Sequence, residues 1–133
     1  MTQVIIHTND NGGVSVTVPT GELSIQEVQT KDTPAGSLIV NTSDLPNQYN
    51  DFFDAWELSG STVTVNFTKA QAIKLAKFNA SAIQESQKRQ LNTFAGIANA
   101  VSDADFTASL TAGRASIASA TTTNELVAIA NPT

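Results

Sequence analysis

The longest helical signal of this 133-residue chain runs from Thr68 to about Val101, and it constrains the fold more than any other stretch. It contains no proline, and its early part is rich in alanine, lysine, glutamine and leucine, which lose little side-chain entropy in a helix. An unbroken helix of this length would span about 50 Å, whereas a compact domain of this size is about 35 Å across. The helix must therefore protrude, bend or pair with another helix.

One face of this predicted helix carries a stripe of mostly apolar side chains spaced three and four residues apart. The stripe comprises Ile73, Ala76, Ala80, Ile83, Gln87, Gln90, Phe94, Ile97 and Val101. It is apolar at both ends and polar at its centre, where the two glutamines lie. In one interpretation the helix breaks near this centre or at Gly96 and packs on its own domain. In the other, the stripe docks on a second copy or on another protein, with the glutamines fixing the register. The candidate interaction residues are then Ile73, Ile83, Gln87, Gln90, Phe94, Ile97 and Val101.

The part of the chain before this helix has the patterns of β-strands. Residues 3–8 and 14–18 are β-branched runs joined by an Asn/Gly turn, which predicts a hairpin. The continuous apolar run 38–40 suits a buried strand, and residues 61–67 alternate apolar with polar side chains. The aromatic residues of 49–58 are spaced as in a short amphipathic helix. Strands followed by helices predict an α+β fold with a small antiparallel sheet.

Two spacings of the kind that begins a helix occur outside the long one. Ser24 followed by Glu27 predicts one or two helical turns, although a strand through residues 23–25 is an alternative. Thr122 followed by Glu125 predicts a short last helix. Thr68 is expected to cap the long helix.

Two regions are thus predicted, a β-rich acidic head over residues 1–67 and a helical part over 68–133. The helical part is expected to contain a long helix at about 69–100, a helix at about 103–119 and a short helix at about 123–130.

Charge and composition exclude several classes of function. The net charge is −5, and residues 1–67 hold eight acidic residues but a single basic one, Lys31. Five of the seven basic residues lie between Lys69 and Arg89, where they suit the solvated face of the long helix. This is too little concentrated positive charge for binding nucleic acid. The chain has no cysteine, no signal peptide and no stretch of membrane-spanning length, so we expect a soluble intracellular protein without disulfides or a membrane partner.

Residues that could carry chemistry are few. His7 is the only histidine, and the sequence places no carboxylate to orient it as a general base. Helical spacing would put Asp51, Asp54 and Glu57 along one surface, as an acid–base pair, as ligands of a hard cation, or as a solvated acidic face. We favour the solvated face, because these residues flank an aromatic anchor. The sequence therefore predicts no enzyme, no metal and no cofactor.

Short motifs occur in a fixed order along nearly the whole chain. They are Lys31-Asp32-Thr33-Pro34, Asp44-Leu45-Pro46, Phe53-Asp54-Ala55-Trp56-Glu57, Val63-Thr64-Val65, Lys69-Ala70, and Thr121-Thr122-Thr123-Asn124-Glu125-Leu126 with Pro132. This series resembles small proteins encoded in the tail gene clusters of tailed bacteriophages and prophages, often labelled tail assembly chaperone-like or tail-fibre-associated.

The resemblance implies a role in tail or virion assembly, or as a minor virion component. The implied partner is a phage tail or fibre protein, or further copies of the chain in a homo-oligomer. The implied location is the host cytoplasm, and the virion if the protein is retained there. The alternative hypothesis is a phage-encoded regulator that binds a host protein through the acidic face between Asp44 and Glu57. A small hydrolase would instead need a pocket with a perturbed carboxylate.

Overall fold

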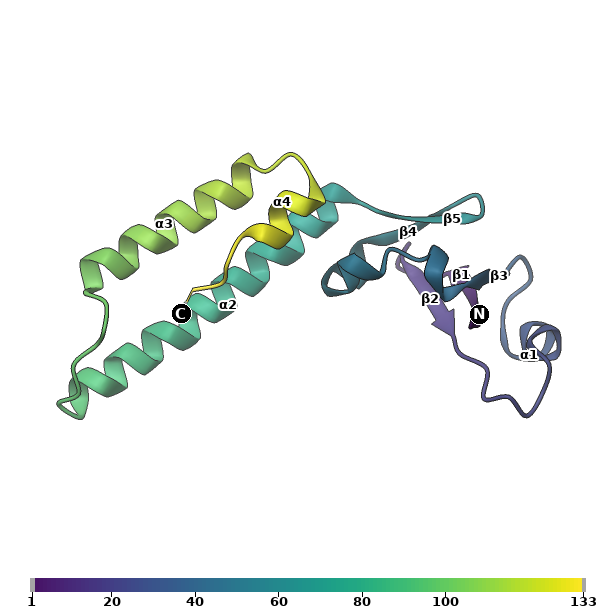
Figure 1. Ribbon diagram of the computed structural model, residues 1–133, viewed down its shortest axis with the longest axis horizontal. Coiled ribbons are helices and arrows are strands. Elements are labelled where there is room, and N and C mark those ends of the chain that lie inside the picture. The colour runs from purple at the N-terminus through teal and green to yellow at the C-terminus, as the bar shows by residue number, and fades with distance from the viewer. Residues whose placement is uncertain (1, 133) are drawn as a thin grey trace. The chain divides into compact units, whose positions relative to one another are not determined.

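The computed structural model describes residues 2–132, and the chain has an α+β fold (Figure 1). It divides into two compact units, which meet in the sequence between Asn66 and Phe67. In Figure 1 the first unit runs from purple to blue, and the second runs from teal through green to yellow.

A three-stranded antiparallel sheet forms the centre of the first unit. Its order is β2 (Val14–Thr17), β1 (Gln3–Thr8) and β3 (Leu38–Asn41), so that β1 is the middle strand. The register places Ile6 between Val16 and Leu38. The predicted hairpin and the predicted strand at 38–40 are therefore present. Asn9 closes the hairpin turn, because its Oδ1 accepts hydrogen bonds from the backbone N–H groups of Asn11 and Gly13.

Both faces of β1 are buried, which accounts for its continuous apolar run. Val4 and Ile6 lie on one face, in a core cluster with Val14, Trp56 and Val63. Ile5 points the other way and is also fully buried. The helix α1 (Ile25–Asp32) contacts β1 and buries Val28. Ser24 is its N-cap, as predicted, since the Ser24 hydroxyl accepts from the Glu27 N–H.

The amphipathic helix predicted at 49–58 is present only in part, as kinked 3₁₀ helix that ends at Ala55. The structure has the short 3₁₀ segments η1 (Thr42–Asp44) and η2 (Asn47–Ala55), the latter kinked at Tyr49 and Phe52, followed by the strand β4 (Trp56–Ser59). Of the aromatic residues, Trp56 lies in the strand, because β4 pairs with β5 (Thr62–Val65) in a second, two-stranded sheet. Gly60, with φ of 62°, allows the tight turn between them.

This correction separates the three acidic residues that helical spacing would have aligned. Asp51 and Asp54 lie in η2, whereas Glu57 lies in β4. The Glu57 carboxylate accepts a hydrogen bond of 3.1 Å from the Asn66 side chain. These residues therefore do not form one helical acidic surface.

The second unit consists of the helices α2 (Phe67–Phe94), α3 (Asp103–Ser119) and α4 (Thr123–Ala128). Figure 1 shows α3 returning alongside α2, and α4 lying on the first half of α2. Buried side chains from all three helices form the core of this unit. They are Ala70, Phe78, Ala82, Phe106, Ile117 and Leu126. Gly113 lets α3 approach Phe78 closely, since a Cβ atom at Gly113 would lie 2.3 Å from Phe78 Cζ.

The long helix departs from its predicted bounds at both ends. It begins at Phe67, so Thr68 lies inside the first turn and is not the cap. It is unbroken through the two glutamines and ends at Phe94 rather than near residue 100. Gly96, with φ of 76°, ends it: the N–H of Ile97 donates to Asn92 O and the N–H of Gly96 to Thr93 O. This pair of bonds is a Schellman motif, which needs a left-handed residue that glycine supplies cheaply.

The two shorter helices are capped by hydroxyl groups. Ser102 caps α3 by accepting from the Asp105 N–H, and Thr122 caps α4 by accepting from the Glu125 N–H. The bounds of α3 agree with the prediction. The last helix ends at Ala128, slightly before the predicted residue 130. Just after the end of α4, the Lys74 ammonium donates to Ile129 O. This bond places a positive charge at a helix C-terminus, where it is favourable.

Candidate protein-interaction surface

The helix α2 has one face that packs within its own unit. Its buried residues are Ala70, Lys74, Phe78 and Ala82, each four positions after the last. This row faces α3 and α4, where Gln71 Nε2 also donates to Ile117 O. The packed face was not found from the sequence, because it contains a lysine and two alanines and so looks only weakly apolar.

The stripe identified from the sequence lies on the opposite side of α2. At 100° per residue, Phe94 lies about 160° around the helix from Phe78, and Ile83 lies about 140° from it. Ile83 is 60% exposed and Phe94 is 95% exposed. Gln87 and Gln90 are exposed, and Ile73 is half-buried. The structure thus brings these five predicted residues onto one outward helix face, hereafter the outer stripe.

The remaining two predicted residues, Ile97 and Val101, do not belong to the outer stripe. Ile97 completes the Schellman motif and Val101 follows it, and both lie in the connection between α2 and α3, where the helical spacing no longer applies. Both side chains are nevertheless exposed.

Sequence reasoning missed Leu91, which is 70% exposed. It lies three residues before Phe94 on α2, one step outside the strict spacing of the stripe. Leu91 could have been found from the sequence, since a large apolar residue next to the stripe widens the apolar face of the helix. We call Leu91 and Phe94 of α2, together with Ile97 and Val101 of the connection that follows it, the apolar end of α2.

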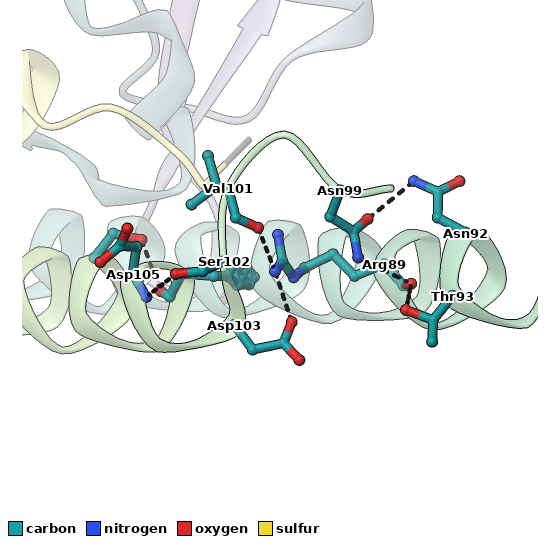
Figure 2. A network of polar contacts seen from close by, with 10 residues as sticks. Arg89, Asn92, Thr93, Asn99, Val101, Ser102, Asp103 and Asp105 are labelled. Carbon is teal, nitrogen blue, oxygen red and sulfur yellow. Dashed lines mark hydrogen bonds and ion pairs between the residues drawn. The ribbon is translucent and has the colours of Figure 1, made fainter. Parts of the chain in front are cut away.

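Polar contacts fasten the connection that carries part of this apolar end (Figure 2). Arg89 Nη2 donates to Val101 O at 2.7 Å and to Asp103 Oδ1 at 2.6 Å. The Arg89 guanidinium also lies 4.8 Å from the centre of the Phe106 ring, a cation–π contact. Only 15% of the Arg89 side chain is exposed, against 91% of the Asp103 side chain. The arginine is therefore the fixed partner, and the connection is held onto α2 around it.

A second bond ties the same connection further along α2. Asn92 Nδ2 donates to Asn99 Oδ1 at 3.1 Å, as Figure 2 also shows. An open groove of about 620 Å³ lies beside these contacts, between the end of α2 and the start of α3. Phe94 and Phe106 line it together with Arg89 and Asp103. Its mixture of rings and charged groups resembles a docking surface more than an enclosed pocket for a small substrate.

Outside this groove, the described chain shows no cluster of side chains suited to catalysis or to metal binding. His7 Nδ1 is buried and has no hydrogen-bond partner among residues 2–132. Within the same residues, no three histidine, aspartate or glutamate side chains are grouped as they would be around a metal ion. The most distinctive feature of the surface is thus apolar.

Comparison with known proteins identifies no relative: no family model, no curated protein and no solved structure matches the chain. The likeness to phage tail-cluster proteins stays a hypothesis that rests on its short motifs. In the described part of the chain, no helix combines the length and the hydrophobicity needed to cross a membrane.

Proposed function

We propose that this chain acts by binding other proteins, as a non-enzymatic assembly protein or minor virion component of a tailed bacteriophage. The observation that carries the binding role is the exposure of Phe94, the most exposed of the large apolar side chains in the described chain, with the exposed Leu91 three residues before it and the exposed Ile97 three residues after it. Exposed apolar groups that cluster in this way are typical of protein–protein contact sites. Aromatic anchors among them supply much of the binding energy of an interface.

The apolar end is also presented rigidly, which favours binding. The Schellman motif fixes the backbone at Gly96, and Arg89 holds the connection through Val101 O. A surface that is already ordered loses less conformational entropy when it binds. Burying one large apolar side chain such as Phe, Leu or Ile contributes about 1.5–3 kcal/mol to the free energy of binding, so three or four of these residues can support a specific complex.

The phage assignment is supported by the ordered motifs described above, and the tail proteins of the same gene cluster are accordingly the proposed partners. During assembly the protein would work in the host cytoplasm. If it stays bound, it would be a component of the virion.

The test is co-purification of the tagged chain with each tail and fibre protein of its own gene cluster. We expect one of them to be retained by the wild-type chain. Phe94→Ser and Ile97→Ser should each reduce retention at least tenfold, since each removes an apolar contact. Val18→Ser is the matched control, because Val18 is 66% exposed but lies in the other unit.

Two results would overturn the proposal. One is that no tail or fibre protein is retained at high micromolar concentration. The other is that the two serine variants bind as well as the control. Mass spectrometry of purified particles separates the two forms of the proposal, because a virion component stays with the particle and an assembly protein leaves it.

A further inference from the structure

The outer stripe has the spacing of a coiled-coil seam. Together with Ala76 and Ala80, which are exposed between its two isoleucines, its positions are Ile73, Ala76, Ala80, Ile83, Gln87, Gln90 and Phe94. The steps between them alternate three and four without exception, an average of 3.5 residues. A straight helix repeats every 3.6 residues, so a strict 3.5-residue row stays in contact only with another helix that winds around it with a left-handed twist. The helix α2 is unbroken over the whole row.

The elements of its own unit leave this row open to such a partner. The buried row of α2, which includes Phe78 and Ala82, is on the other side of the helix. The stripe borders α3 only near its end, where Gln90 and Phe94 line the open groove and stay exposed. Ile83 and Phe94 remain mostly exposed. The positions that flank the seam include a single charged residue, Lys77, so no cluster of like charges there opposes a second helix.

The two glutamines restrict which helix this partner can be. A purely apolar partner would cover the amides of Gln87 and Gln90 without hydrogen bonds, which costs about 1–3 kcal/mol for each buried unsatisfied group. An amide side chain both donates and accepts, so a glutamine can pair with a glutamine. We propose that the partner of the outer stripe is a second copy of this chain, with the two α2 helices parallel and in register.

Parallel register is favoured because it matches all the layers of the stripe at once. Gln87 then faces Gln87 of the second copy, and Ile83 and Phe94 face their own counterparts. An antiparallel pair can also bring Gln87 to Gln90, but it overlaps only from about Ile83 to Phe94 and leaves Ala76 and Ala80 uncovered. Polar seam residues that meet their own kind are a known means of fixing coiled-coil register.

This inference rests on the proposed function in that it names one partner of the same binding protein. Phe94 is shared by the two surfaces: in the dimer it lies at the end of the seam, and the tail protein would contact it from the side of Leu91 and Ile97, which the seam leaves exposed. The seam contains two alanines and two amides, so we expect the two copies to bind each other with modest affinity. Self-association should therefore be measured at a chain concentration on the order of 100 μM.

The experiment has two arms. In the first, light scattering of the full chain should give twice the mass of 13.9 kDa. Gln87→Glu places two carboxylates opposite each other and should weaken self-association at least tenfold. Gln84→Glu, the same change one step off the seam, and Ile97→Ser should leave the mass unchanged.

In the second arm, one cysteine is introduced into a chain that has none of its own. Under mild oxidation, Ala80→Cys should form a disulfide-linked dimer, because a disulfide needs Cα atoms within about 4.4–6.8 Å and equivalent seam positions meet in parallel register. In the antiparallel pair the two cysteines would lie about 25 Å apart. Ala112→Cys, on exposed α3, is the control that should not link.

Three results would overturn the inference: a monomer, a dimer that Gln87→Glu does not weaken, or a dimer in which Ala80→Cys fails to link. The failure is distinguishable from failure of the proposed function. A monomer that still retains a tail protein through Phe94 and Ile97 would remove the second copy and leave the binding role standing. A monomer that retains none would remove both.

Discussion

The two halves of α2 form one continuous helix, but they are held in place by different interactions. The first half, from Phe67 to Ala82, contains every buried residue of the helix. The second half, residues 83–94, contains none, and its large apolar residues Ile83, Leu91 and Phe94 are all exposed. Hydrophobic burial therefore stabilises the first half, whereas hydrogen bonds around Arg89 and a glycine cap stabilise the second.

The difference shows how a small unit can keep apolar surface available without losing its fold. Burial of Phe78 against α3 ties the helices together at one end. Polar anchors at the other end order the chain but hide little apolar surface. Buried apolar side chains and exposed large apolar side chains thus lie mainly in different stretches of the same helix, so the second stretch can be changed with limited effect on stability.

The largest expected effect on stability is the difference between truncating a phenylalanine in the first half of α2 and truncating one in the second half. Phe78→Ala should lower the free energy of unfolding by about 3–5 kcal/mol, because it leaves a cavity beneath α3. Phe94→Ala, the matched change in the second half, should alter it by no more than about 0.5 kcal/mol in dilute protein, because its ring is exposed. Denaturant unfolding followed by far-ultraviolet circular dichroism measures both.

Equal losses in the two variants would contradict the comparison between the halves. A loss for Phe94→Ala that appears only at high protein concentration would instead indicate that self-association covers the ring.

A smaller effect is expected where the second half ends. Gly96→Ala should cost about 1–2 kcal/mol, because the left-handed conformation at φ 76° brings a Cβ atom too close to the next carbonyl oxygen. Gly96→Asn should cost less, since asparagine tolerates this conformation better. Amide hydrogen exchange at Ile97, which donates to Asn92 O, should speed up in the same order.

If Gly96→Ala changed neither the stability nor the exchange at Ile97, the glycine would not be what ends α2. Ala98→Gly, in the same connection, serves as the control for a backbone change away from the Schellman motif.

The features of α2 that the sequence predicted are those that depend on local chemistry. Strict spacing identified the stripe from Ile73 to Phe94, and Gly96 was recognised as a place where the helix could end. The packed row was not recognised, because Lys74 looks solvent-exposed until Ile129 O is seen beside its ammonium. Which face of a helix is buried depends on neighbours far along the chain, and apolar content alone selected the outward face.

The same limit explains the error at residues 49–58. Spacings of three and four between aromatic residues fit a helix locally. Pairing of Trp56 with Val65 across the Gly60 turn overrode that preference. The capping residues Ser24 and Thr122, by contrast, act within four residues of themselves, and both were predicted correctly.

The smallest effect is expected at the exposed member of the Arg89 contacts. Asp103→Asn should lower the free energy of unfolding by less than about 1 kcal/mol, because an ion pair with one largely exposed partner is screened by water. Asp103 also lies in the first turn of α3, where any negative charge is favourable. Asp105→Asn removes a charge from the same turn, so the difference between the two variants isolates the bond to Arg89. That difference should vanish in 1 M salt, where charges are screened within about 3 Å. A loss above 2 kcal/mol that persists in salt would mean that Asp103, and not the buried stem of Arg89 with Val101 O and Phe106, holds the connection in place.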